Sequence, residues 1–182
     1  MRKLLFQSDD YGLTDSVADG ILKGIDQGII RNTGLFVNMP SSARAAEKIR
    51  DRQGICVGID INLVAGQPVS DPAEVPSLVN PEGHFVPSVQ RMREGRIIGR
   101  QGMCLCFEED PYDFEQTLLE TDNQVKRFIE LMGRKPDYFH GHSMATPNTQ
   151  RAARAIAEKY DILMTTDVMS GSQVSMIPCT WT

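Results

Sequence analysis

Hydrophobic and polar residues follow two periods along this chain, and segments with the two periods alternate. Short apolar or alternating runs predict strands, whereas apolar residues three to four positions apart predict amphipathic helices. Strands are predicted over residues 3–7, 33–38, 56–63, 137–139 and 162–165. Helices are predicted from a cap at Asp15 or Ser16 to Gly28, after residues 40–42, over residues 112–132, and from Thr146-Pro147 to Tyr160. This order predicts an α/β layer or barrel fold.

A long segment, residues 64–109, follows neither period. Five prolines interrupt it before Val89, and no long regular element is predicted there. A connection of this length inside a compact domain is usually functional, for example as a lid or a substrate loop. Phe85 lies in this segment and could stack on a sugar ring, although a role as a packing anchor fits it equally well.

Polar residues stand where three of the predicted apolar strands give way to loops. Asp9 and Asp10 follow the first strand, Asp60 lies within the third, and His140 and His142 follow the fourth. The carboxyl ends of parallel strands meet on one face of a sheet or barrel, and ligand sites gather there. We therefore expect these five side chains to lie close together.

The chemistry of these residue types indicates a metal-dependent hydrolase. Adjacent carboxylates at a buried strand end repel each other, and a bound divalent cation removes that penalty. A second carboxylate can then act as a base toward water, and imidazole completes a common ligand set. Ordinary explanations also exist: Asp9-Asp10 as a turn or helix cap, and His140 and His142 as satisfied surface or core residues. Asp60, an acid among alternating apolar residues, must be paired or functional.

Composition narrows the possible classes of protein. The 182 residues suit a single domain over residues 1–182, and the 41% apolar and 24% charged content is ordinary for a globular protein. The net charge of −5 argues against a nucleic-acid partner. The N-terminus has only three apolar residues after its two cations, and no stretch is long enough to cross a membrane. The sequence predicts a cytoplasmic protein without a membrane partner.

Five stretches of sequence, which follow one another over most of residues 1–150, carry a resemblance to a known family. They read QSDDYGLTDSVADGI, GIIRNTGLFVNMPSSARAAE, VGIDINLVAGQPV, EVPSLVNPEGHF and PDYFHGHS. In these stretches the chain resembles the YdjC-like carbohydrate deacetylases, a group that includes chito-oligosaccharide deacetylases. The resemblance implies a (β/α) barrel-like fold of the polysaccharide-deacetylase or YdjC type. It also implies one divalent ion, Mg²⁺ or Zn²⁺ with Mn²⁺ as a further candidate, and removal of N-acetyl groups from a small carbohydrate.

The resemblance also assigns roles to single residues. Asp9 matches the catalytic base, Asp10 a metal-binding aspartate and His142 a metal-binding histidine. Asn62 lies in the stretch that helps to line the family's site. Two further roles are expected from side-chain chemistry and not from the resemblance. Phe85 is expected to contact substrate as an aromatic ring of the long loop. His140 is the candidate proton donor to the leaving amine.

Two positions depart from the family pattern in opposite senses. Asp60 stands where the family has a metal-binding histidine, and His140 stands where it has an aspartate. We interpret the two as an exchange that keeps one carboxylate and one imidazole beside the ion, with Asp10, Asp60 and His142 as ligands. In the alternative, Asp60 and His140 form an ordinary buried ion pair and the metal is lost.

The chain is also shorter than the family members it resembles, which predicts a fold that is incomplete at its C-terminus. An exposed sheet edge would then be covered by a second subunit in a homodimer, unless the sequence is a truncated product. Two rival functions remain open. One is a metal hydrolase for another amide or a phosphoester, and the other is a catalytically impaired sugar-binding or regulatory protein.

Overall fold

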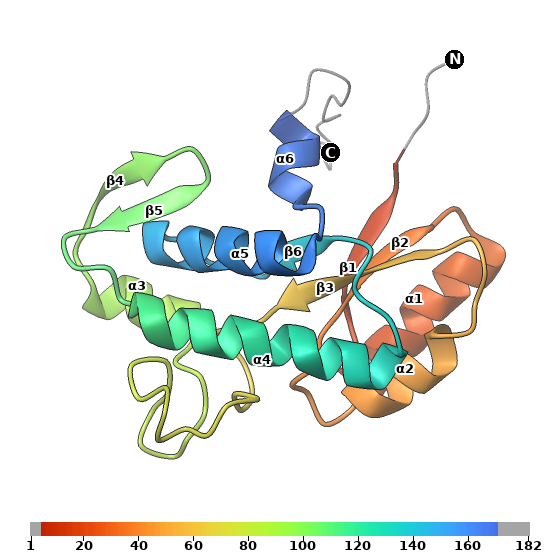
Figure 1. The fold of residues 1–182 in the computed structure, drawn as a ribbon, viewed down its shortest axis with the longest axis horizontal. Helices are drawn as coiled ribbons and strands as arrows, with labels where there is room; N and C mark the ends of the chain where they lie inside the picture. Colours follow the sequence, from red (N-terminus) through yellow and green to blue (C-terminus); the bar gives the residue numbers. More distant parts are fainter. Residues whose placement is uncertain (1–4, 171–182) are drawn as a thin grey trace.

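Four parallel strands form the sheet on which the rest of the chain is arranged (Figure 1). In the computed structural model, which describes residues 5–170, the strand order is β1-β2-β3-β6. The strands are β1 (Gln7–Tyr11), β2 (Asn32–Leu35), β3 (Cys56–Ile61) and β6 (Phe139–Gly141). Because each strand pairs in parallel with the next, their carboxyl ends lie at the same edge of the sheet. The predicted α/β class is confirmed, and within the described residues the sheet is open, with β1 and β6 at its edges.

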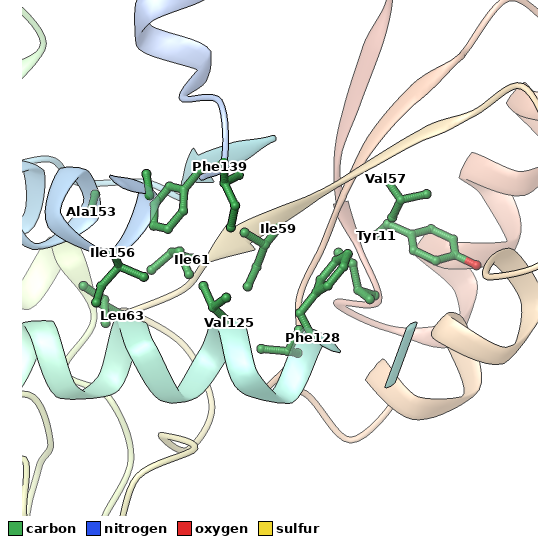
Figure 2. Close-up of a cluster of buried hydrophobic side chains, with 14 of the residues drawn as sticks. Tyr11, Val57, Ile59, Ile61, Leu63, Val125, Phe128, Phe139, Ala153 and Ile156 are labelled. Atoms are coloured by element: carbon green, nitrogen blue, oxygen red, sulfur yellow. The ribbon is translucent and has the colours of Figure 1, made fainter. Parts of the chain in front are cut away.

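The helices that follow the strands pack against the sheet. They are α1 (Asp15–Gln27), α2 (Ser42–Ile49), α4 (Phe114–Met132) and α5 (Pro147–Tyr160), which contact β1, β2, β3 and β6 in that order. Figure 2 shows Ile59 and Phe139 of the sheet in the apolar core that Val125 and Phe128 of α4 help to form. Successive residues of a strand face opposite sides of the sheet. The residues of β3 and β6 that alternate with the core-facing Ile59 and Phe139 therefore face away from these helices.

Local chemistry sets the ends of the helices. Gly133 ends α4 with a left-handed φ of 69°, as predicted, because a residue without a Cβ adopts that conformation at little cost. Thr146 and Thr149 form a capping box at the start of α5, with Pro147 in the first turn. The predicted cap of α1 was wrong by one residue: the Thr14 hydroxyl, and not Asp15 or Ser16, accepts from the amide of Val17.

Residues 64–109 contain regular elements that the sequence pattern did not predict. They are α3 (Ser88–Glu94) and an antiparallel hairpin of β4 (Ile97–Gln101) and β5 (Cys104–Phe107). All five residues of β4 are exposed, so this strand has no buried face to create an alternating pattern. Arg91 is buried, and its guanidinium donates to the carbonyls of Ser77, Leu78 and Pro111 while it stacks on Tyr112.

Two predicted strand boundaries were also wrong. The first strand was placed at residues 3–7, whereas β1 begins at Gln7 and includes both Asp9 and Asp10; residues 1–4 lie outside the described part. The predicted strand at 162–165 is a single bridge between Phe139 and Met164, after which α6 (Thr165–Ser170) begins. No helix among residues 5–170 is both long and apolar enough to cross a bilayer.

A buried polar network connects α4 to the loop that follows β3. Glu120 of α4 is fully buried, and its carboxylate accepts from the amides of Val69 and Ser70 and from the Gln124 side chain. Gln124 in turn bonds both the amide and the carbonyl of Asn62. The backbone after β3 is therefore fixed to α4 by side-chain hydrogen bonds.

Glu120→Ala should destabilise the protein by about 2–4 kcal/mol, because buried backbone amides would lose their acceptor. Urea unfolding would measure this change. Glu130→Ala is the matched control, because Glu130 lies on the same helix with its side chain 65% exposed, and it should change stability by less than about 0.5 kcal/mol. Equal effects of the two substitutions would contradict a role for the network in holding the loop.

Candidate metal and catalytic site

Five acidic and imidazole side chains meet at the carboxyl edge of the sheet, as the sequence predicted. His142 Nδ1 lies 3.0 Å from Asp10 Oδ1, and His140 Nε2 lies 3.8 Å from Asp9 Oδ2. Asp60 joins the two pairs: its Oδ2 accepts from the amide of Asp10 at 2.9 Å. One ligand atom from each of Asp9, Asp60 and His140 also lies within 4.8 Å of the others. We refer to these five residues as the acid–imidazole cluster.

The first strand is distorted where it contributes to this cluster. The register between β1 and β2 shifts between Ser8 and Tyr11, and Asp10 has a φ of 68°. A regular strand would send Asp9 and Asp10 to opposite faces, and such an irregularity redirects side chains. A positive φ in a residue other than glycine costs on the order of 1–3 kcal/mol, and such strain concentrates at functional sites.

Asp60 reaches β1 from β3 by crossing the intervening strand β2. The crossing takes place over Gly34, where a Cβ would lie only 1.9 Å from Asp60 Oδ1. Any side chain at position 34 would therefore displace the carboxylate. Sequence reasoning did not single out Gly34, although a glycine inside a predicted strand is a known indication of a close approach.

The environment of Asp60 suits a cation. The residue is fully buried, and its Oδ1 has no hydrogen-bond partner among the residues that the structure describes. Burial raises the pKa of Asp60 to about 7, opposed by the hydrogen bond from the Asp10 amide and reinforced by the charges of Asp9 and Asp10. Among the residues that the structure describes, no lysine or arginine pairs with Asp9, Asp10 or Asp60. The desolvated carboxylate thus lacks the compensating positive charge that buried acids normally have.

The ring of His140 is held in one tautomer. Thr165 Oγ1 donates its only proton to the carbonyl of Phe139 at 2.8 Å, and it lies 3.0 Å from His140 Nδ1. The hydroxyl must therefore accept from His140 Nδ1–H, which leaves the lone pair of the neutral ring on Nε2, the atom that faces Asp9. Sequence reasoning missed Thr165, and no pattern in the sequence indicates it.

His142 is placed differently from His140. Its ring packs edge-on against Phe36, with the centroids 4.8 Å apart. Its Nδ1 lies close to Asp10 Oδ1, but the two do not form a well-directed hydrogen bond. No other side chain or carbonyl within residues 5–170 orients the ring by a hydrogen bond. Asp10 and His142 thus form a second pair in the cluster, in which the Asp10 side chain is 36% exposed, compared with 45% for Asp9.

The two predicted substrate-contacting residues lie deeper in the protein than a sugar can reach in this conformation. Asn62 is fully buried, and its side chain bonds Asn38, Ala65 and the amide of Val64. Phe85 is 2% exposed and belongs to the apolar core, which agrees with the alternative role of a packing anchor. Direct contact of either residue with substrate stays a prediction.

A cavity of about 360 Å³ adjoins the two histidines. Its lining combines the edge of β6 with Met144 and Ala153 near and on α5, Cys104 of the hairpin and Met164 and Thr165 beside α6. A larger hollow of about 610 Å³ lies between α5 and residues 135–137 and contains no residue of the acid–imidazole cluster. The smaller cavity is lined by His140 and His142 of the cluster, whereas the three aspartates do not belong to its lining.

Comparison with known proteins places these features in a family. The family model described as YdjC-like protein matches residues 3–177. The carbohydrate deacetylase of Vibrio vulnificus is 36% identical over 173 residues, which are 94% of this chain and 61% of that protein. The chitooligosaccharide deacetylase of Escherichia fergusonii is 31% identical over 141 residues, 78% of this chain and 49% of its own length.

A solved structure shares the fold. A putative cellobiose-phosphate cleavage protein from Enterococcus faecalis superimposes with a TM-score of 0.73 at 23% identity, covering 88% of this chain and 57% of that one. At this identity the likeness concerns the fold alone. The chain spans about half to three fifths of the length of the curated relatives it matches.

The raised pKa of Asp60 predicts how the stability of the ion-free protein depends on pH. Between about pH 4 and pH 7 the folded protein keeps a proton that the unfolded chain has released, so the free energy of unfolding should fall as pH rises through this window. Asp60→Asn should remove up to about 4 kcal/mol of this fall. Urea unfolding in the presence of a chelator at pH 5 and pH 8 would measure it.

Asp51→Asn is the control for this experiment, because Asp51 has a side chain that is 90% exposed. It should leave the pH dependence of the wild-type protein unchanged. If Asp60→Asn also leaves the pH dependence unchanged, then Asp60 does not carry a raised pKa in the folded state.

Proposed function

This chain belongs to the YdjC-like protein family, and on that premise we propose that it hydrolyses the N-acetyl group of an amino sugar or a short chito-oligosaccharide with the help of a divalent ion. The observation that carries the proposal is the acid–imidazole cluster at the carboxyl edge of the sheet. The names of the relatives from Vibrio vulnificus and Escherichia fergusonii support an N-acetylated carbohydrate as the substrate. Because the chain spans only part of their length, its own activity is a proposal.

The donor set of the cluster fits a divalent cation. The unpartnered Oδ1 of the buried Asp60 supplies an anionic ligand, and its neighbours supply further carboxylate and imidazole donors. Mixed oxygen and nitrogen ligands of this kind suit Zn²⁺ or Mn²⁺, and the carboxylates alone also suit Mg²⁺. Once bound, such an ion polarises an amide carbonyl and makes water more acidic.

The protein's own groups account for the proton transfers that amide hydrolysis requires. A carboxylate must take a proton from the attacking water, and an acid must protonate the sugar nitrogen as the carbon–nitrogen bond breaks. The cluster contains a carboxylate next to an imidazole twice, in Asp9 with His140 and in Asp10 with His142. The assignment of the base to Asp9 stays a prediction from the family resemblance, and that of the donor to His140 stays a prediction from the chemistry of imidazole.

The adjoining cavity supports a substrate of modest size. Its volume of about 360 Å³ is at the lower end of the range for small-molecule sites, and its lining is a mixture of apolar side chains and a few polar groups. An acetamido group presents a methyl and a polar carbonyl together, which matches such a lining. A phosphoester would instead favour basic side chains, and among residues 5–170 no lysine or arginine lines this cavity.

The proposal predicts that acetate is released from N-acetylglucosamine or its β-1,4-linked oligomers when Mn²⁺ or Zn²⁺ is supplied, and that a chelator abolishes the release. Asp60→Ala should lower kcat/KM by about 100-fold or more, the scale on which loss of one electrostatic or acid–base group affects an enzyme. An enzymatic assay for acetate measures both effects.

Asp51→Ala, which removes an exposed aspartate ten residues before the end of β3, should keep the wild-type rate. Binding of the oligomers without acetate release under all ion conditions would contradict the proposed activity, and it would favour the non-catalytic sugar-binding alternative.

A further inference from the structure

We infer that the ion is bound by Asp9, Asp60 and His140, and that Asp10 and His142 remain free for proton transfer and substrate contact. This division differs from the ligand set of Asp10, Asp60 and His142, of which the family resemblance implies Asp10 and His142 and the exchange interpretation adds Asp60. It also moves the base and donor roles from Asp9 and His140 to Asp10 and His142. It rests on the metal dependence of the proposed function, but not on the identity of the substrate.

Geometry is the first support for this assignment. Within residues 5–170, Asp9, Asp60 and His140 form the group of three whose ligand atoms all lie within 4.8 Å of one another. The separation of 3.8 Å between His140 Nε2 and Asp9 Oδ2 is too long for a hydrogen bond, whereas two atoms on either side of one ion can stand that far apart. Asp60 and His140 are also direct neighbours in the register of β3 and β6.

The free oxygen of Asp60 is the second support. This carboxylate is fully buried, its Oδ2 accepts from the Asp10 amide, and its Oδ1 has no hydrogen-bond partner within residues 5–170. A buried anionic oxygen without a partner is costly, and a cation next to it would remove that cost. Asp10 Oδ1 is likewise buried without a hydrogen-bond partner among the described residues, but it lies 3.0 Å from His142 Nδ1. The Asp10 amide holds Asp60 from one side, and Asp60 Oδ1 remains available on the other.

The tautomer of His140 is the third and independent support. Histidines that bind metals usually donate their other ring N–H to an oxygen, which fixes the ring and directs the free lone pair at the ion. Thr165 provides this oxygen for His140, at 3.0 Å from Nδ1. His142 has no comparable outer contact in the described part of the chain, because its ring is held by packing on Phe36.

Gly34 makes this arrangement possible. Because β2 has no side chain at position 34, the Asp60 carboxylate can lie over that strand and come within reach of Asp9 on β1. Gly34 is therefore a positioning residue for the ion site. It acts through Asp60 and does not itself touch the ion.

Calorimetric titration of the ion-free 182-residue chain with MnCl₂, repeated with ZnCl₂, tests the assignment without any substrate. Asp9→Asn and His140→Ala should each raise the Kd by at least about 100-fold, whereas Asp10→Asn and His142→Ala should change it by less than about tenfold. Thr165→Val should raise the Kd by about 10–100-fold, and Thr165→Ser, which keeps the hydroxyl, should restore it.

Glycine substitutions test the positioning role separately. Gly34→Ala should weaken ion binding as strongly as the loss of a ligand does, while Gly20→Ala, on α1 where a Cβ meets nothing within 4 Å, should have no effect. Circular dichroism in the presence of a chelator would confirm that each variant is folded, and Thr165→Val would carry the test if Gly34→Ala does not fold.

The outcomes separate this assignment from the proposed function. A wild-type chain that binds neither ion would overturn both the assignment and the metal dependence. Loss of binding in Asp10→Asn and His142→Ala that equals or exceeds the loss in Asp9→Asn and His140→Ala would overturn the assignment alone. The expected pattern of Kd values in a chain that releases no acetate would support the assignment and contradict the deacetylase proposal.

Discussion

The structure of the site depends on the buried carboxylate of Asp60, which has fewer hydrogen-bond and charge partners than a buried acid normally has. Asp60 lies near the end of β3 between apolar residues and is fully buried. One of its oxygens accepts from the Asp10 amide, and the other has no hydrogen-bond partner in the described part of the chain. No lysine or arginine among the described residues neutralises it. A protein that maintains a charge in this position must compensate it, and a cation bound in place is the compensation that fits the surrounding donors.

Several features of the fold serve this one carboxylate. The parallel order of β1, β2, β3 and β6 brings the strand ends together, and the glycine in β2 opens the path across the sheet. The irregular register of β1 allows two successive aspartates to face the same cluster at the cost of a strained backbone at Asp10. Beneath this edge, the Glu120–Gln124–Asn62 network holds the chain directly after β3. Strain and buried polar groups of this kind are expected where function, and not stability, determines the residue.

Much of the fold and most of the cluster follow from the sequence because they rest on local patterns. Apolar periodicity located β2, β3, β6 and the four helices that pack on the sheet, but it placed the first strand too early, and polar residues near strand ends located the five clustered side chains. The β4–β5 hairpin escaped prediction because it has no buried face on β4, and periodicity reports burial. The buried state of Arg91 escaped for a different reason: its partners are backbone carbonyls, which no side-chain pattern encodes.

The division of roles within the cluster could not be predicted from the sequence either. Adjacent aspartates and a His-x-His pair look equivalent in a linear chain, and only contacts far apart in sequence distinguish them. Thr165, 25 residues after His140, fixes the tautomer of that ring, and Gly34, 26 residues before Asp60, decides where that carboxylate lies. The family resemblance placed Asp10 and His142 on the ion, whereas the contacts of this chain favour Asp9 and His140.

Anomalous diffraction from crystals of the protein grown with Mn²⁺ tests this central claim most directly. The account predicts one anomalous peak at coordination distance, roughly 2.0–2.3 Å, from carboxylate oxygens of Asp9 and Asp60 and from His140 Nε2. A peak bound by Asp10 and His142 instead, with Asp9 and His140 outside coordination distance, would contradict it.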